Sequence, residues 1–141
     1  MDPVIATLSE KTEGKRSPNI ASTATLKEVI AIIRPQKHIA TRKGLEAVGI
    51  FSYTTLTVLG RSKQRGLKIS AEGKEAVSIR FLPKQYFSIV VTEKQVSLAV
   101  SAIVKANRTG VGVAGDGRIF IVDIDAAVRI STHERGGVAV V

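Results

Sequence analysis

Apolar residues along the chain fall into four runs of strand length. Val29 to Ile33 is continuously apolar and is closed by Arg34-Pro35. Such a run is typical of a strand covered on both faces or of one at a subunit contact. The three further strands predicted from β-branched and apolar runs are Tyr53 to Leu59, Tyr86 to Val91 and Arg118 to Ile124. The tail from Ser131 to Val141 has no clear pattern.

Two helices are predicted between these strands. The first is predicted over Gln36 to Val48. Pro35 favours a helix start at this point, because the first helical position does not need the N–H that proline lacks. The second begins at Thr92, which forms a capping box with Gln95. Apolar side chains then recur at helical spacing until Gly110.

Three segments fall outside this pattern. Gly60 to Pro83 has no sustained period, and a loop of that length in a compact domain is usually functional or mobile. Residues 1–25 are polar and unpatterned, so we expect a disordered N-terminal extension followed by one domain over 26–141. Asp125 is expected to cap a short helical turn through Val128.

The predicted order is β-α-β, a long loop, and a second β-α-β. Two such halves form one antiparallel sheet with both helices on one face, the ferredoxin-like α+β fold. The strands are apolar almost throughout, so the face without helices is apolar as well. Since burying apolar area stabilises by roughly 25 cal/mol per Å², that face should be covered by further copies, and we expect a homo-oligomer.

Composition narrows the class of protein. The 141 residues are 44% hydrophobic, which suits one globular domain, and they include no cysteine. Disulfide scaffolds and thiolate metal sites are therefore excluded. We expect no membrane insertion and a cytoplasmic protein, because no apolar stretch approaches a membrane span and the first residues lack a signal-peptide pattern.

The charge indicates anionic partners. The formal net charge is +9, and the segment from Arg61 to Lys84 holds seven basic and two acidic residues. Nucleic acid, anionic metabolites and acidic proteins all fit this charge. A nucleic-acid-binding ferredoxin-like module stays open as an alternative, although only 4% of residues are aromatic and no strand carries a stacking platform. Catalysis is not expected, because His38 and His133 lie far apart and no paired-carboxylate motif occurs.

The run from Gly115 to Phe120, Gly-Asp-Gly-Arg-Ile-Phe, is the strongest candidate for chemistry. Glycines let the backbone approach a ligand and present N–H groups, and the following Arg118 adds a fixed positive charge. The run is therefore a candidate cradle for an anion such as a phosphate.

Five motifs in this order resemble the PII signalling family, the trimeric nitrogen-regulatory proteins, and the likeness covers about residues 26–135. The segments resemble the opening strand, the base of the long T-loop, its return to the sheet, the B-loop and the C-terminal loop, and they are Ile30–Pro35, Gly60–Gly66, Phe81–Lys84, Gly115–Phe120 and Val128–Gly136. The T-loop stretch Ile69–Ala76 lacks a tyrosine, which looks most like the nitrogenase-associated branch.

The resemblance implies a homotrimer with an ATP or ADP site in each cleft between subunits. Arg118 and Arg129 match basic positions for the phosphates, the B-loop backbone would add N–H donors, and Thr54 and Val90 match positions near the adenine. The full nucleotide set carried over is Thr54, Gly60, Gln64, Val90, Gly115, Asp116, Gly117, Arg118 and Arg129.

The resemblance also implies Mg²⁺ and 2-oxoglutarate as ligands. Gln64 matches the residue that would help ligate Mg²⁺ between the phosphates and 2-oxoglutarate, and Lys84 matches the one that would pair with a 2-oxoglutarate carboxylate. The implied activity is a non-enzymatic sensor of ATP or ADP and 2-oxoglutarate. Its T-loop would bind a target protein of nitrogen metabolism: an enzyme, a transporter or a nitrogenase component.

Two departures keep a further alternative open, a PII-like trimer that has lost ligand sensing. Val111-Gly112-Val113-Ala114 makes the B-loop two residues longer than in the family. Ser131 stands where the family has a second Arg, so one phosphate contact is expected to be weakened or lost.

Overall fold

A computed structural model describes residues 25–61, 68–71, 74–77 and 81–140. The expected N-terminal extension lies outside these residues except for Thr25. The elements are β1 (Leu26–Ile33), a 3₁₀ turn η1 (Pro35–Lys37), α2 (His38–Ala47), β2 (Thr54–Gly60), β3 (Lys68–Ala71), β4 (Lys74–Val77), β5 (Leu82–Thr92), α3 (Glu93–Asn107), β6 (Arg118–Ile124) and α4 (Gly137–Val140).

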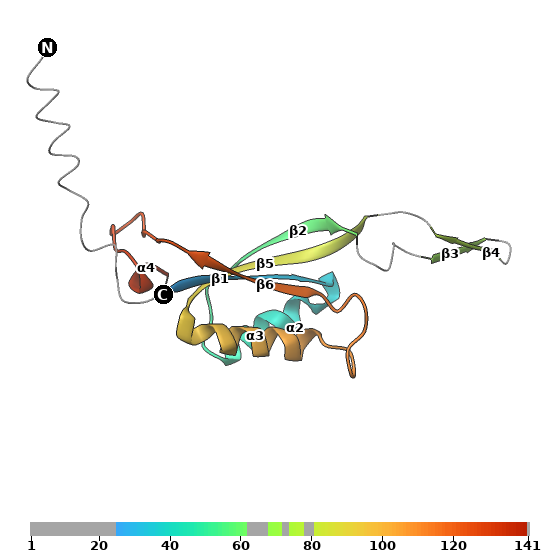
Figure 1. Ribbon diagram of the computed structural model, residues 1–141, viewed down its shortest axis with the longest axis horizontal. Coiled ribbons are helices and arrows are strands. Elements are labelled where there is room, and N and C mark those ends of the chain that lie inside the picture. The colour runs from blue at the N-terminus through green and yellow to red at the C-terminus, as the bar shows by residue number, and fades with distance from the viewer. Residues whose placement is uncertain (1–24, 62–67, 72–73, 78–80, 141) are drawn as a thin grey trace, which may run out of the picture.

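Four strands form one antiparallel sheet in the order β2-β5-β1-β6. Helices α2 and α3 lie side by side beneath one face of it (Figure 1). This is the ferredoxin-like α+β arrangement, so the predicted fold is confirmed. The predicted capping box is also present, since the Thr92 backbone N–H donates to Gln95 Oε1 at 3.1 Å at the start of α3.

The core lies between the sheet and the two helices. Side chains alternate between the faces of a strand, so every second residue of β1 and β5 points toward the helices. These positions are occupied by aliphatic residues and one phenylalanine. Small and branched side chains of the two helices pack against them. The most deeply buried members are Val29, Ala31, Ile33, Phe87, Ile89, Leu45, Ala99 and Ile103.

The two helices touch closely and share a buried polar contact. A Cβ on Gly44 would lie 3.3 Å from the carbonyl oxygen of Ala102, so a larger residue there would press α2 away from α3. Asn107 Nδ2 donates to Thr41 Oγ1 at 2.9 Å, and the Thr41 hydroxyl donates to the carbonyl of Lys37 at 2.8 Å. These contacts fix the end of α3, from which the B-loop leaves.

The opposite face of the sheet carries apolar side chains among polar ones and is open in one chain. The register pairs Leu56 with Tyr86, Tyr86 with Ile32, and Ile30 with Phe120 across the four strands. Leu56 and Phe120 are each 47% exposed. This is the surface on which the expectation of a homo-oligomer depends.

Two sequence predictions about local structure need correction. The segment from Gly60 to Pro83 is not loop throughout, because β3 and β4 pair as a two-stranded sheet and β5 begins at Leu82 rather than Tyr86. A proline in the sequence indicates that a strand is interrupted. Pro83 nevertheless lies within β5, opposite Leu59 of β2 and beyond the end of β1, so no strand on its other side needs its missing N–H as a donor.

The second correction concerns the segment after β6. Asp125 does not cap a helical turn, because residues 125–127 are not helical and Val128 instead forms a bridge with Arg135. A short helix, α4, follows nearer to the C-terminus.

Candidate functional site

A cleft of about 440 Å³ opens between the start of the T-loop (residues 61–81), the start of β5 and the B-loop (residues 108–117). It lies on the open face of the sheet, because Ile32 and Phe120 form its floor. The lining residues are Ile32, Gly60, Arg61, Lys84, Val113, Ala114, Gly115, Asp116, Gly117, Arg118 and Phe120. Six residues predicted from the sequence therefore meet here: Gly60, Lys84, Gly115, Asp116, Gly117 and Arg118.

The B-loop is built from two successive turns. The Gly112 N–H donates to the Thr109 carbonyl at 2.8 Å, and the Asp116 N–H donates to the Val113 carbonyl at 3.3 Å. Gly117 has a φ of +122°, and a Cβ there would lie 2.5 Å from the carbonyl oxygen of Ile32. Only glycine fits this approach of the loop to β1.

The Asp116 carboxylate braces this loop rather than facing a ligand. It accepts from the backbone N–H groups of Val113 at 2.9 Å and Thr109 at 3.1 Å, and from Arg34 Nη1 at 2.9 Å. These donors, Val113 foremost, hold the pKa of Asp116 well below its usual range. The Asp116 N–H, expected to face a phosphate, already has the carbonyl of Val113 as its acceptor.

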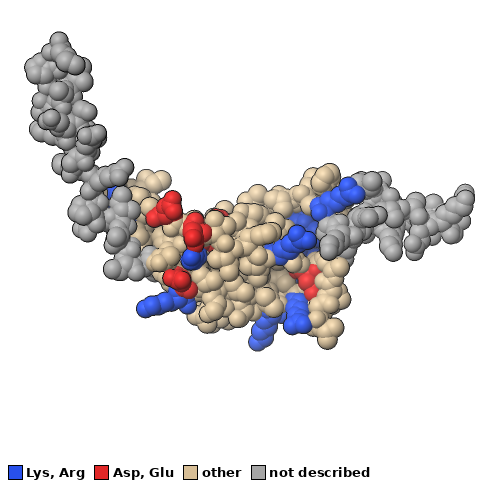
Figure 2. All heavy atoms as spheres, viewed as in Figure 1, with Lys and Arg blue, Asp and Glu red and all other residues tan. Residues whose placement is uncertain are grey.

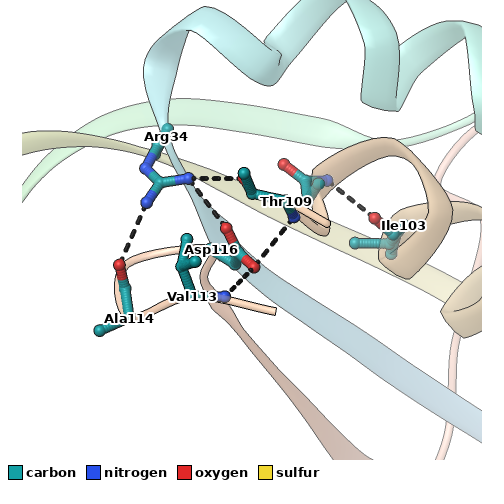
Figure 3. A network of polar contacts seen from close by, with 7 residues as sticks. Arg34, Ile103, Thr109, Val113, Ala114 and Asp116 are labelled. Carbon is teal, nitrogen blue, oxygen red and sulfur yellow. Dashed lines mark hydrogen bonds and ion pairs between the residues drawn. The ribbon is translucent and has the colours of Figure 1, made fainter. Parts of the chain in front are cut away.

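Arg34 is a site residue that the sequence analysis missed. Besides Asp116, its guanidinium donates to Thr109 Oγ1 at 3.4 Å and to the Ala114 carbonyl at 3.1 Å, so it contacts three points of the B-loop (Figure 3). The side chains of Arg34 and Asp116 are only 21% and 17% exposed. In the sequence, Arg34 marks the end of a buried strand and belongs to the segment that resembles the family's opening strand, but nothing there indicates a contact with the B-loop.

Three cationic side chains line the cleft: Arg61, Lys84 and Arg118. Among the described lining residues, Asp116 carries the one carboxylate, and it is paired with Arg34. On the face seen in Figure 2, several basic side chains lie at the end from which the T-loop leaves, whereas most acidic ones lie toward the opposite end together with further basic ones. The cleft therefore has a net positive charge that suits a ligand with several negative charges. Arg61 was recognised in the sequence as part of a charge cluster but not as a site residue.

The remaining predicted site residues lie elsewhere. Thr54 and Val90 occupy the open face of the sheet, opposite Ser88 and Glu28 respectively, and neither lines the cleft. Arg129 is held in the C-terminal segment, where it pairs with Glu134 at 3.2 Å and donates to the Val138 carbonyl at 2.9 Å.

Gln64, the predicted Mg²⁺ ligand, lies outside the described residues. Within the described ranges, no group of three His, Cys, Asp or Glu residues could hold a metal ion. The Asp116 carboxylate is already engaged, so a divalent cation here would take its oxygens chiefly from a bound ligand, as Mg²⁺ commonly does with phosphates. None of the helices in the described part of the chain is long and apolar enough to cross a membrane.

The chain is similar in sequence to known proteins. The profile of the family described as Nitrogen regulatory protein P-II matches residues 26–134. The protein named Nitrogen fixation nifHD region GlnB-like protein 2 from Methanothermococcus thermolithotrophicus is 42% identical over 128 residues, which is 82% of this chain and 98% of the relative. Nitrogen regulatory protein P-II 2 of Methanothermobacter thermautotrophicus is 43% identical over 115 residues, or 82% and 97% of the two chains.

A solved structure extends the likeness to three dimensions. The crystal structure of Arabidopsis thaliana PII bound to citrate superposes with a TM-score of 0.65 at 29% identity, over 82% of this chain and 89% of that one. The name Nitrogen fixation nifHD region GlnB-like protein 2, which a relative from Methanobacterium ivanovii also carries, bears out the resemblance to the nitrogenase-associated branch. The chain belongs to the PII family of nitrogen-regulatory proteins, which are signalling regulators rather than enzymes.

Proposed function

We propose that this protein is a homotrimeric sensor of ATP or ADP and of 2-oxoglutarate, which regulates a target of nitrogen metabolism through its T-loop. The observation that carries the proposal is the cleft itself. Three cations from separate parts of the chain line one space of about 440 Å³ beside the glycine-rich B-loop: Arg61 directly after β2, Lys84 near the start of β5 and Arg118 at the start of β6. A polyphosphate or a dicarboxylate would supply the negative charge that this lining requires.

Two anions in one cleft need a cation between them. Phosphate oxygens and a 2-oxoglutarate carboxylate repel each other, and Mg²⁺ would bridge them through oxygen ligands, with Gln64 contributing one. Lys84 lies in the lining near the start of β5 and would pair with the second carboxylate. The citrate named for the Arabidopsis structure is also a polycarboxylate, which is in keeping with an anion site in this family.

The trimer would complete the nucleotide site. Arg129, Thr54 and Val90 do not line the cleft of their own chain, and the open apolar face of the sheet provides the surface for subunit contact. In the proposed assembly these three residues reach the nucleotide from a neighbouring subunit. Binding of ligands would then change which T-loop conformation is favoured, through their different affinities for its states.

Calorimetric titration tests this function directly. ATP, ADP and 2-oxoglutarate are each added with and without Mg²⁺. We expect ATP and ADP to bind alone, and 2-oxoglutarate to bind only when both Mg²⁺ and ATP are present. The sensor proposal fails if 2-oxoglutarate gives no heat under any of these conditions.

A PII-like scaffold without ligand sensing is the second candidate, because the extended B-loop favours it. Val113 and Ala114, which belong to the longer segment, line the cleft and add apolar surface next to the cations. Ser131 also cannot supply a guanidinium. Absence of heat with both nucleotides, from a protein that sediments as a trimer, would establish this alternative.

A further inference from the structure

The B-loop is held from behind by a side chain of another element. Arg34 follows β1 directly, whereas Asp116 and Ala114 lie about 80 residues further along the chain. Arg34 does not line the described part of the cleft. Its guanidinium nevertheless donates hydrogen bonds to three residues of the B-loop (Figure 3). Its guanidinium is thus placed to act on a ligand only through the loop.

The two carboxylate oxygens of Asp116 have different partners. Oδ2 accepts hydrogen bonds from the loop's own N–H groups, those of Thr109 and Val113, whereas Oδ1 accepts one from Arg34. The second guanidinium nitrogen binds the Ala114 carbonyl, inside the segment that lengthens the loop. The planar fork of an arginine can hold both acceptors at once, which a lysine ammonium does less well.

Charge gives the pair a second effect. Asp116 belongs to the lining of a cleft whose other charged residues, among those that the structure describes, are cations. Without a counter-charge it would repel an anion placed there. Arg34, at 2.9 Å, neutralises it.

We propose that Arg34 is a positioning residue that holds the B-loop, through Asp116 and Ala114, in the form that receives nucleotide phosphates. The inference rests on the proposed function for its ligand. It adds to that function a dependence on a residue that contacts no part of the nucleotide.

The test compares Arg34→Met, Arg34→Lys and a matched control, Lys27→Met. Lys27 pairs with Asp123 across β1 and β6 at the other end of the same strand, so the control removes one cross-strand ion pair far from the cleft. We expect Arg34→Met to weaken ATP binding about tenfold, since hydrogen bonds to charged groups contribute strongly. Arg34→Lys should lie between Arg34→Met and the unaltered protein, because it keeps the charge but not the fork.

Two readouts separate positioning from general damage. Adenosine, which has no phosphate, should bind all variants alike, whereas a partly unfolded protein would lose both ligands. In the protein without ligand, hydrogen exchange at the Thr109 and Val113 amides should quicken on the order of tenfold in Arg34→Met and stay unchanged in Lys27→Met.

The outcomes are distinct. Unchanged ATP affinity or unchanged exchange in Arg34→Met overturns the positioning role while leaving the proposed function intact. Equal losses of ATP and adenosine overturn it as well, by showing general damage. Failure of the unaltered protein to bind ATP overturns the proposed function and the positioning role together.

Discussion

The two faces of the four-stranded sheet come from the same strands but differ in how far they are buried. On the face toward α2 and α3, Phe87 and Ile89 are completely buried. On the opposite face, Leu56 and Phe120 keep 47% of their surface exposed. A single chain therefore completes one apolar face and leaves the other open. The cleft with its three cations lies on the incomplete face, so ligand binding and subunit contact are expected to depend on the same surface.

The largest expected effect comes from breaking the completed face. Phe87→Ala would remove a ring that contacts His38 and Tyr53 at centroid distances of 5.4 and 5.5 Å. We expect a loss of about 3–5 kcal/mol in the free energy of unfolding, as for other buried phenylalanines. Urea denaturation measures it. Phe51→Ala is the matched control, since Phe51 is 73% exposed and its removal should change stability by less than about 0.5 kcal/mol.

The second effect concerns the open face. Leu56→Asp would place a carboxylate on the open face, within the expected subunit contact, where desolvating an unpaired charge costs several kcal/mol. We expect sedimentation to show a monomer at micromolar concentration, with the circular dichroism of the folded sheet and helices preserved. If this variant and the unaltered protein sediment alike, the open face is not the contact between subunits.

A smaller effect should link ligand binding to the contact between subunits. If Arg129 reaches the cleft of a neighbouring subunit, Arg129→Ala should weaken ATP binding by about 1.5–3 kcal/mol, the contribution of one charge-assisted contact. Arg118→Ala, from within the cleft, should give a loss of similar size in calorimetry. Equal ATP affinity in Arg129→Ala and the unaltered protein would show that the assigned site is wrong.

Much of this architecture could be predicted from sequence because it depends on local patterns. The run Val29 to Ile33 and the capping box at Thr92 specify a strand and a helix start without any distant partner. The family resemblance then identified the loops that line the cleft. What could not be predicted depends on distant or very short contacts. Arg34 meets Asp116 across 82 residues, and the four-residue strands β3 and β4 are too short to show a period.

Asp116 itself gave a partly misleading signal. Its place in a Gly-Asp-Gly run indicates a ligand cradle, and it does line the cleft. Its carboxylate nevertheless serves the loop, because two backbone N–H groups and Arg34 surround it. Sequence alone does not show whether an aspartate in such a run points toward a ligand or back into its own loop.

The smallest expected effect is a pH dependence that distinguishes the braced loop from the open face around it. The pKa of Asp116 lies well below its usual value of 3.8 because the N–H groups of Val113 and Thr109 favour the carboxylate. A carboxyl group with a lowered pKa in the folded state contributes stability that is present above its unfolded pKa and lost as pH falls through the folded pKa. Asp116→Asn should therefore be less stable than the unaltered protein at pH 7, and this difference should shrink as pH falls below about 4.

Urea denaturation of both proteins between pH 7 and pH 3 measures this difference, with Asp123→Asn as the control for an aspartate whose side chain is 79% exposed. A stability difference between Asp116→Asn and the unaltered protein that stays constant down to pH 3 would show that the charge of Asp116 does not brace the loop.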